Sequence, residues 1–428
     1  MKYILFASFF IIYSVFGETL SLDLHETISR AIKESEDYKI QENEIIKSDY
    51  KTKEISSILY PQITGEVTYI DNLRVPDLPT TRFMKDFNLD GGINVNQIIT
   101  TFGRISSSIS AMKKMNSMNK YRKDSIKDEV IFNAKLLYFN AYFAKQVLKI
   151  TQESYENTRK NKEILENRTE MGRISKRDNI KISADMAARI PMIANAESTY
   201  VTALDSLRKS IGADADCEIE LREGYRKNYD NFNLSTALAS LGHNQPILKS
   251  LQQSIRAQED LIRSKRAEYF PTLSAFFRYN YKGSSEDYFI GNNTLFNYTS
   301  VGINLQIPLF YGFRTNSKIK QSVADKDNAI LTYQKTKKNL ELELDKAITE
   351  YNELIKTLPA NQEAIDLAEE SFKLSQNLFS SGQLSVTDLN DAEMMLTTQK
   401  LKKETNLFKL QVALAKIERL ACIGNFNE

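Results

Sequence analysis

The spacing of hydrophobic and polar positions changes at regular points along the 428-residue chain. Residues 22–59 and 234–269 each show a helical pattern that ends at a proline, in Tyr60-Pro61 and in Phe270-Pro271. Because proline disfavours the helical conformation of the residue before it, both helices are expected to stop there. After each proline, apolar and polar residues alternate with a period of two, which predicts β-strands.

The alternating runs predict four strands, two after each proline. Their apolar positions are Ile63, Gly65, Val67 and Tyr69, then Ile93 and Val95, then Leu273, Ala275, Phe277, Tyr279 and Tyr281, then Val301, Ile303, Leu305 and Ile307. Polar segments at 72–90 and 282–297 are predicted loops. Runs of about 10 residues with one apolar and one polar face are typical of strands that line a water-filled barrel in a bilayer. A soluble sheet with one buried face is the alternative.

Long helices are predicted beyond these strands. Residues 105–172 and 315–382 have apolar residues at alternating spacings of three and four, as in coiled coils. At 1.5 Å per residue, each helix would form a rod of about 100 Å. Each rod is expected to turn at a glycine and return as a second helix over 175–212 or 385–424. Pro359 is expected to kink the second rod.

The chain is duplicated. Tyr60-Pro61 recurs as Phe270-Pro271, Gly103 as Gly312 and Gly172 as Gly382, with offsets of 210, 209 and 210 residues. Such constant spacing indicates two structurally equivalent halves. We therefore divide the mature chain into a first repeat (18–212, tip near 172), a linker (213–233) and a second repeat (234–428, tip near 382).

The first 17 residues have the pattern of a secretory signal peptide. Lys2 precedes a short apolar run, and Val15 and Gly17 stand at the positions of a cleavage site. No cysteine follows the expected cut, so a lipid-anchored amino terminus is not indicated. No later segment approaches the roughly 20 apolar residues of a membrane-spanning helix. We therefore expect any membrane insertion of the mature chain to use strands.

Composition argues against several classes of function. The formal charge is +2, with 57 basic and 55 acidic residues spread along the chain, so nucleic acid is not an expected partner. Two histidines offer little material for a metal site, and we find no phosphate-binding GxxxxGK[ST] loop. No cofactor and no enzymatic activity are expected, because no catalytic constellation is present. Cys217 and Cys422 lie near the ends of the two copies; two separate thiols are favoured over a disulfide.

Five short motifs give the chain a resemblance to the TolC-like outer membrane efflux protein family. They are the helix-to-strand breaks Tyr60-Pro61-Gln62 and Phe270-Pro271-Thr272, the strand-to-helix break Pro308-Leu309-Phe310-Tyr311-Gly312, and the tip motifs Met171-Gly172-Arg173-Ile174-Ser175 and Ser381-Gly382-Gln383-Leu384-Ser385. The resemblance extends over essentially the whole mature chain. The first copy departs from the family at Ile99-Thr100-Thr101-Phe102-Gly103, which lacks the usual proline.

The resemblance implies a mainly α fold with a small β part. Long antiparallel coiled-coil helices would form a helical barrel, and four membrane strands per chain would complete a twelve-stranded β-barrel in a homotrimer. Four strands alone cannot close a barrel, and an open sheet edge is not tolerated in lipid, so several chains must contribute.

Proteins of this family act as passive exit ducts of tripartite efflux pumps or of type I secretion systems. The expected location is the outer membrane of a double-membraned bacterium, with a large periplasmic part. The implied partners are a periplasmic adaptor protein, an inner-membrane transporter and the outer membrane lipid. Adaptor contacts are expected at the tips, at Gly172, Arg173, Gly382 and Gln383.

The resemblance also implies a periplasmic constriction lined by acidic residues just after the tips. The matching positions are Asp178, Asp388 and Asp391. A ring of carboxylates at a narrow mouth would favour cations. Asp178 and Asp388 also fit a helix capping box, in which the acidic side chain satisfies free backbone donors.

Asp391 corresponds to Lys181 in the first copy, 210 residues earlier. Opposite charges at equivalent positions suggest that Asp391 and Lys181 attract each other and help to hold the mouth shut. A solvated Lys181 without a partner is the alternative, because exposed ion pairs contribute little.

A periplasmic or secreted coiled-coil scaffold without a pore is the competing hypothesis for the whole chain. It accounts for the signal peptide and the helical periods, but not for the duplicated strands with two unlike faces.

Overall fold

The structure is a computed structural model of the chain. It describes residues 19–74, 85–170, 176–226, 229, 231–288, 290–291 and 294–423. The expected signal peptide at 1–17 lies outside these residues. The described chain is mainly helical with a small β part, as expected. Across these ranges, every helix is too short or too polar to cross a membrane.

The same order of elements occurs twice. The first series is β1 (Thr19–Leu22), α1 (Leu24–Glu34), α2 (Glu36–Ser56), β2 (Gln62–Asp71), β3 (Phe87–Thr100), α3 (Arg104–Glu170) and α4 (Lys176–Ser210). The second is β4 (Glu218–Leu221), α5 (Leu234–Asn244), α6 (Pro246–Arg266), β5 (Thr272–Ser285), β6 (Leu295–Gln306), α7 (Arg314–Ser381) and α8 (Val386–Ala421). A short 3₁₀ turn precedes β2 at Ser57–Leu59 and β5 at Ala267–Tyr269.

Two expectations about the helices need correction. The helices predicted at 22–59 and 234–269 are each broken in two, after α1 at Ser35 and after α5 at Gln245. Gln245 leaves the helical conformation because Pro246 follows it. α7 continues through Pro359, the position of the expected kink. α4 likewise runs through Pro191.

The described chain divides into two compact units. Unit 1 contains the residues up to Lys39, Ser125–Gln245 and Lys338–Glu428, and unit 2 contains Ile40–Asp124 and Pro246–Lys337. Each unit therefore takes part of both sequence copies.

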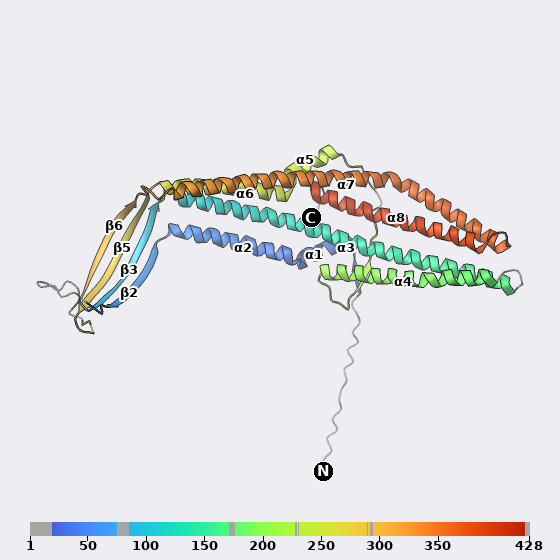
Figure 1. Ribbon diagram of the computed structural model, residues 1–428, viewed down its shortest axis with the longest axis horizontal. Coiled ribbons are helices and arrows are strands. Elements are labelled where there is room, and N and C mark those ends of the chain that lie inside the picture. Colours follow the sequence, from blue (N-terminus) through green and yellow to red (C-terminus); the bar gives the residue numbers. More distant parts are fainter. Residues whose placement is uncertain are drawn as a thin grey trace, which may run out of the picture. The chain divides into compact units, whose positions relative to one another are not determined.

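Unit 2 holds a four-stranded antiparallel sheet in the order β2-β3-β5-β6 (Figure 1). Ile63 pairs with Val95, Val95 with Phe277, and Phe277 with Val301, so these apolar residues form one row across the sheet. The next row contains Thr64, Asn94, Arg278 and Ser300. Neighbouring rows of a pleated sheet face opposite sides, and the alternation predicted from the sequence is therefore present.

The strands are longer than predicted. β3 begins at Phe87, inside the loop expected at 72–90, while β5 continues to Ser285 and β6 begins at Leu295, both inside the loop expected at 282–297. Polar residues extend the ladder here: Asp90 lies opposite Lys282, and their side chains form an ion pair of 2.8 Å. The prediction failed because it treated polar residues as loop residues, although one face of this sheet is polar.

Each strand-to-helix break places two consecutive residues in the left-handed region. In the first copy Phe102 and Gly103 have φ values of 49° and 101°, and in the second Gly312 and Phe313 have 57° and 62°. The two helices begin 210 residues apart, at Arg104 and Arg314. Glycine and phenylalanine have therefore exchanged places between the copies, which accounts for the glycine offset of 209. At the two helix-to-strand breaks, Pro61 and Pro271 directly precede β2 and β5. At the second strand-to-helix break, Pro308 follows β6.

Unit 1 is built from helices around apolar cores. The antiparallel pairs α3–α4 and α7–α8 are visible in Figure 1. One core joins Tyr138 on α3 and Leu207 on α4 to Leu22 and Leu221, which lie on a parallel pair of short strands, β1 and β4. This pair was not expected, and β4 lies in the segment interpreted as a linker. A second core near the tips contains Leu165, Ile182, Phe372, Phe379 and Leu389. Cys217 and Cys422 are thiols.

Candidate functional site

The sheet of unit 2 carries its apolar side chains on an uncovered face. Val67, Val301 and Ile303 are 78%, 80% and 71% exposed within the single chain. The strand register makes these side chains neighbours of other exposed apolar residues, among them Ile63, Ile93 and Phe277. A contiguous exposed apolar patch of this kind marks a surface that is covered by something other than water.

The opposite face of the sheet is polar and hollowed. A cavity of about 520 Å³ lies there, and most of the side chains that line it are polar: Gln62, Thr64, Asp90, Asn94, Asn96, Arg278, Asn280 and Lys282. The ion pair between Asp90 and Lys282 lies on this face. The sheet is therefore suited to separating an apolar medium from an aqueous one.

In unit 1, a series of polar contacts joins α4 to α8. The Lys181 ammonium donates to Thr387 Oγ1 at 2.7 Å, and Asn390 donates its side-chain amide to Asp185. The three α4 residues 181, 185 and 189 are four residues apart and so share one helix face. We call this set of contacts the α4–α8 seam.

The third contact of the seam is a buried ion pair. Arg189 donates to Glu393 Oε2 at 2.5 Å and also to Ser154 on α3, while Thr397 Oγ1 donates to Glu393 Oε1 at 2.9 Å. The Glu393 side chain is 0% exposed and that of Arg189 12%. A carboxylate this deeply buried is tolerated because it is paired and hydrogen-bonded.

Reading the sequence did not identify this pair. A signal was available, because the positions 210 residues away in the other copy are the uncharged Ser183 and Gln399. Charges that appear in one copy only, on helices expected to pack together, are candidates for pairing.

Comparison with known proteins agrees with the fold described above. Residues 237–421 match the sequence model of the outer membrane efflux protein family. This match covers 185 of the 428 residues and supports the resemblance to that family. A curated relative, the probable outer membrane lipoprotein SilC of Salmonella typhimurium, is 19% identical over 352 residues, which are 79% of this chain and 72% of SilC.

Solved structures of channels share the fold of nearly the whole chain. The CmeC outer membrane channel of Campylobacter jejuni superposes with a TM-score of 0.81 at 16% identity, covering 93% of this chain and 85% of CmeC. CusC, whose structures describe transmembrane channel formation, gives a TM-score of 0.79 at 17% identity, covering 94% and 93%.

The resemblance stated from the sequence motifs is thus confirmed. The match to an outer membrane efflux family supports the expectation that the chain is not an enzyme. It disfavours the hypothesis of a coiled-coil scaffold without a pore.

The residues expected at the mouth lie in unlike settings. Lys181 and Asp391 line the same cavity, but in the described part of the chain no ion pair joins them, and Lys181 contacts Thr387 instead. Ser385 caps α8: its Oγ accepts from the backbone N–H of Asp388 at 3.2 Å and donates to the Asp388 carboxylate at 2.7 Å. Asp178 is half-buried in the first turn of α4.

Only one of the two tips lies within the described residues. Gly172 and Arg173 fall outside them. At the other tip, Gly382 has φ of 88° and is exposed, and the backbone N–H of Gln383 donates to Leu378 O at 2.9 Å. A left-handed glycine with this hydrogen bond is a common way to end a helix, and it leaves the turn between α7 and α8 open to contact.

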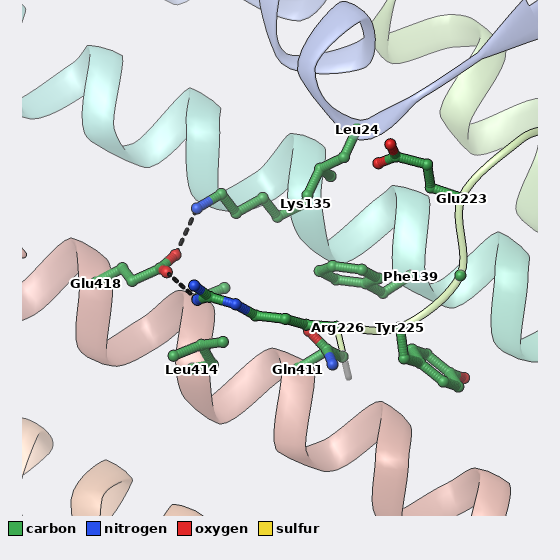
Figure 2. A pocket seen from close by; sticks show the side chains of 11 residues that line it. Leu24, Lys135, Phe139, Glu223, Tyr225, Arg226, Gln411, Leu414 and Glu418 are labelled. Atoms are coloured by element: carbon green, nitrogen blue, oxygen red, sulfur yellow. Dashed lines mark hydrogen bonds and ion pairs between the residues drawn. The ribbon is translucent and has the colours of Figure 1, made fainter. Parts of the chain in front are cut away.

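A second ion cluster in unit 1 lines a cavity of about 580 Å³ between α3, α8 and the segment after β4 (Figure 2). The Lys135 side chain is 5% exposed and bonds to Glu418 at 2.5 Å, while Arg226 approaches the other oxygen of Glu418 at 3.9 Å. Phe139 and Tyr225 lie beside them (Figure 2). Two cations around one carboxylate tie α3 and the segment after β4 to α8, which is a structural role.

Proposed function

We propose that this protein is a subunit of a homotrimeric outer membrane channel that serves as the passive exit duct of a tripartite efflux pump. The observation that carries the proposal is the four-stranded sheet with one exposed apolar face and one polar, hollowed face. In a closed barrel the apolar face would contact the hydrocarbon core and the polar face would line water.

The two edge strands of the sheet support assembly from several chains. β2 and β6 are its edge strands, and within the described residues the outer edge of each has no partner strand. Unpaired backbone groups are not tolerated in lipid, so β6 of one copy would pair with β2 of the next. Three copies would supply twelve strands, and their long helices would form a tunnel in the periplasm.

Because the family model is described as one of efflux proteins, we place an efflux pump ahead of a type I secretion system, which is the second candidate. Energy would come from an inner-membrane transporter, joined through a periplasmic adaptor protein. The turns at Gly172-Arg173 and Gly382-Gln383 are the proposed adaptor contacts. The exposed Gly382 turn supports this assignment.

The mouth of the duct would be controlled near the start of α4 and α8. Asp178, Asp388 and Asp391 would place carboxylates around the constriction, and Lys181 would tie α4 to α8. The contact between Lys181 and Thr387 supports the second part of this proposal, with the hydroxyl taking the place of the carboxylate partner first expected.

The test begins with the mass of the protein extracted from outer membranes with detergent, measured by size exclusion with light scattering. We expect a trimer, and single channels after reconstitution into a planar bilayer. Lys181→Glu should raise the conductance, because a carboxylate replaces the ammonium that donates to Thr387.

Lys209→Glu, an exposed lysine near the other end of α4, is the control and should leave the conductance unchanged. A monomer recovered without detergent would contradict the duct itself. Equal conductance of the Lys181→Glu variant and the wild type would contradict only the role given to the seam.

A further inference from the structure

The polar face of the sheet in unit 2 holds a charge that no neighbouring side chain balances. Three charged residues line the cavity on this face, namely Asp90, Arg278 and Lys282. Asp90 and Lys282 form the ion pair of 2.8 Å described above. Arg278 is exposed, and no carboxylate of the described residues forms an ion pair with it. The cavity therefore carries a net positive charge, which comes from one guanidinium.

An aromatic ring holds this guanidinium in position. Arg278 Cζ lies 4.6 Å from the centroid of the Phe276 ring. The ring in turn lies against Gly302, the residue opposite Phe276 on β6, where an added Cβ would come within 2.7 Å of the ring. A larger residue at position 302 would thus displace the ring. Arginine that stacks on an aromatic face keeps a planar set of N–H donors, which matches the two oxygens of a carboxylate.

Two amide side chains beside Arg278 supply further donors. Asn94 lies directly opposite Arg278 on β3, and Asn280 follows it on the same face of β5. Over the ranges that the structure describes, neither amide makes a hydrogen bond to another protein group. Both line the cavity of about 520 Å³ together with Arg278, and sites for small molecules commonly measure roughly 300–1,000 Å³.

We propose that this cavity binds small organic carboxylates. The Arg278 guanidinium pairs with the carboxylate through two parallel N–H···O bonds, and Asn94 and Asn280 donate to the remaining oxygen lone pairs. One unbalanced cation suits a singly charged anion better than a phosphate monoester, which carries about two charges at neutral pH.

This inference deepens the proposed function, because it gives the water-filled side of the sheet a class of anion that it retains. It rests on the proposed function for the role of the site. The cavity itself is formed by the strands of one chain and does not depend on assembly.

The test uses the full chain in a non-ionic detergent and 2-naphthoate, an aromatic carboxylate, with equilibrium dialysis as the measurement. We expect saturable binding above that of protein-free micelles. Arg278→Gln removes the guanidinium and should raise the dissociation constant about tenfold, the effect expected when hydrogen bonds to a charged group are lost. Phe276→Leu should also weaken binding, because the ring no longer holds the guanidinium in position.

Two controls separate this site from general attraction and from loss of the fold. Lys51→Gln removes an exposed positive charge on α2 of the same unit, outside the cavity, and should leave binding unchanged. The neutral analogue 2-naphthamide has the shape of naphthoate without its charge and should bind the wild type more weakly. The proposal is overturned if the wild type binds no more naphthoate than micelles do, or binds naphthamide as tightly. It is also overturned if Arg278→Gln binds naphthoate as the wild type does.

Light scattering on the same sample distinguishes failure of this site from failure of the duct. A trimer that binds no naphthoate would overturn the site alone. A monomer that binds naphthoate with the expected response to Arg278→Gln would contradict the duct and support the site.

Discussion

The two units of this protein differ in whether their apolar side chains lie inside or outside. In unit 1 the apolar residues are inside, and Tyr138, Leu207, Leu344 and Leu389 are fully buried. In the sheet of unit 2 they are outside, and the polar residues line a hollow. Each unit must satisfy the medium that surrounds it, and the proposed function would place water around the helices and lipid around the sheet, which agrees with this difference.

The comparison also extends to buried charges. Unit 1 buries an ion pair, Arg189 with Glu393, within the α4–α8 seam. The helices of unit 2 also bury a carboxylate: the Asp260 side chain is 2% exposed and pairs with Lys114 at 2.7 Å, near the hydrogen bond of 2.8 Å between Ser108 and Ser264. Both units thus contain paired polar groups in their interiors, and they differ in where their apolar surface is directed.

The largest effect is expected from breaking the buried ion pair of unit 1. Arg189→Leu leaves the Glu393 carboxylate buried without its partner, which should cost about 3–5 kcal/mol in the free energy of unfolding. Urea unfolding followed by circular dichroism would measure the loss. Arg189→Leu combined with Glu393→Leu should recover most of it, because no charge is then buried. If the double variant is no more stable than the single one, burial of an unpaired charge is not the cause.

The sheet offers the next test, since its two faces can be compared at neighbouring residues. Val301→Arg places a charge on the apolar face and should cost about 2–4 kcal/mol if that face meets the middle of a bilayer. Ser300→Arg places the same side chain on the polar face and should cost little. Unfolding by urea in lipid vesicles gives both values. Equal costs at the two positions would remove the assignment of the apolar face to lipid.

A smaller effect is expected from acid, at a buried carboxylate of unit 2. Burial alone would raise the pKa of Asp260, but hydrogen bonds from Lys114 and Ser110 and the charges of Lys114 and Arg263 outweigh it and lower the pKa. A lowered folded-state pKa stabilises the fold above the unfolded pKa of about 3.9, and this stability is lost as the pH falls through the folded value.

Asp260→Asn should therefore unfold with a flatter dependence on pH below about pH 4 than the wild type. Glu259→Gln, at the adjacent exposed position on α6, is the matched control and should keep the wild-type dependence. Thermal unfolding scans between pH 2.5 and 7 would measure both. A control variant that flattens as much as Asp260→Asn would show that the response is not specific to Asp260.

Much of the fold could be predicted because its signals are local. The helix expected at 315–382 is α7, Arg314–Ser381, since the left-handed Gly312 and Gly382 mark both ends. The pairing of β1 with β4 could not be predicted, because two four-residue strands about 200 residues apart carry no periodic pattern. Strand ends were misplaced where polar residues such as Asp90 continue the ladder.

The candidate site, too, has features that could be predicted from the sequence and features that could not. Comparing the copies identified Lys181 and Asp391 as a difference in charge near the tips, and both line one cavity. It could not show that the Lys181 ammonium donates to Thr387, because this hydrogen bond depends on side-chain geometry between two helices.

The two units cut across the two copies, and this has a consequence for how the polypeptide can be divided. The chain passes between the units four times, at residues 40, 125, 246 and 338, and three of these crossings lie inside the continuous helices α2, α3 and α7. A cut between the copies, in 213–233, would give two fragments that each hold portions of both units and the whole of neither. The sequence is duplicated, but neither copy corresponds to a compact unit of the folded chain.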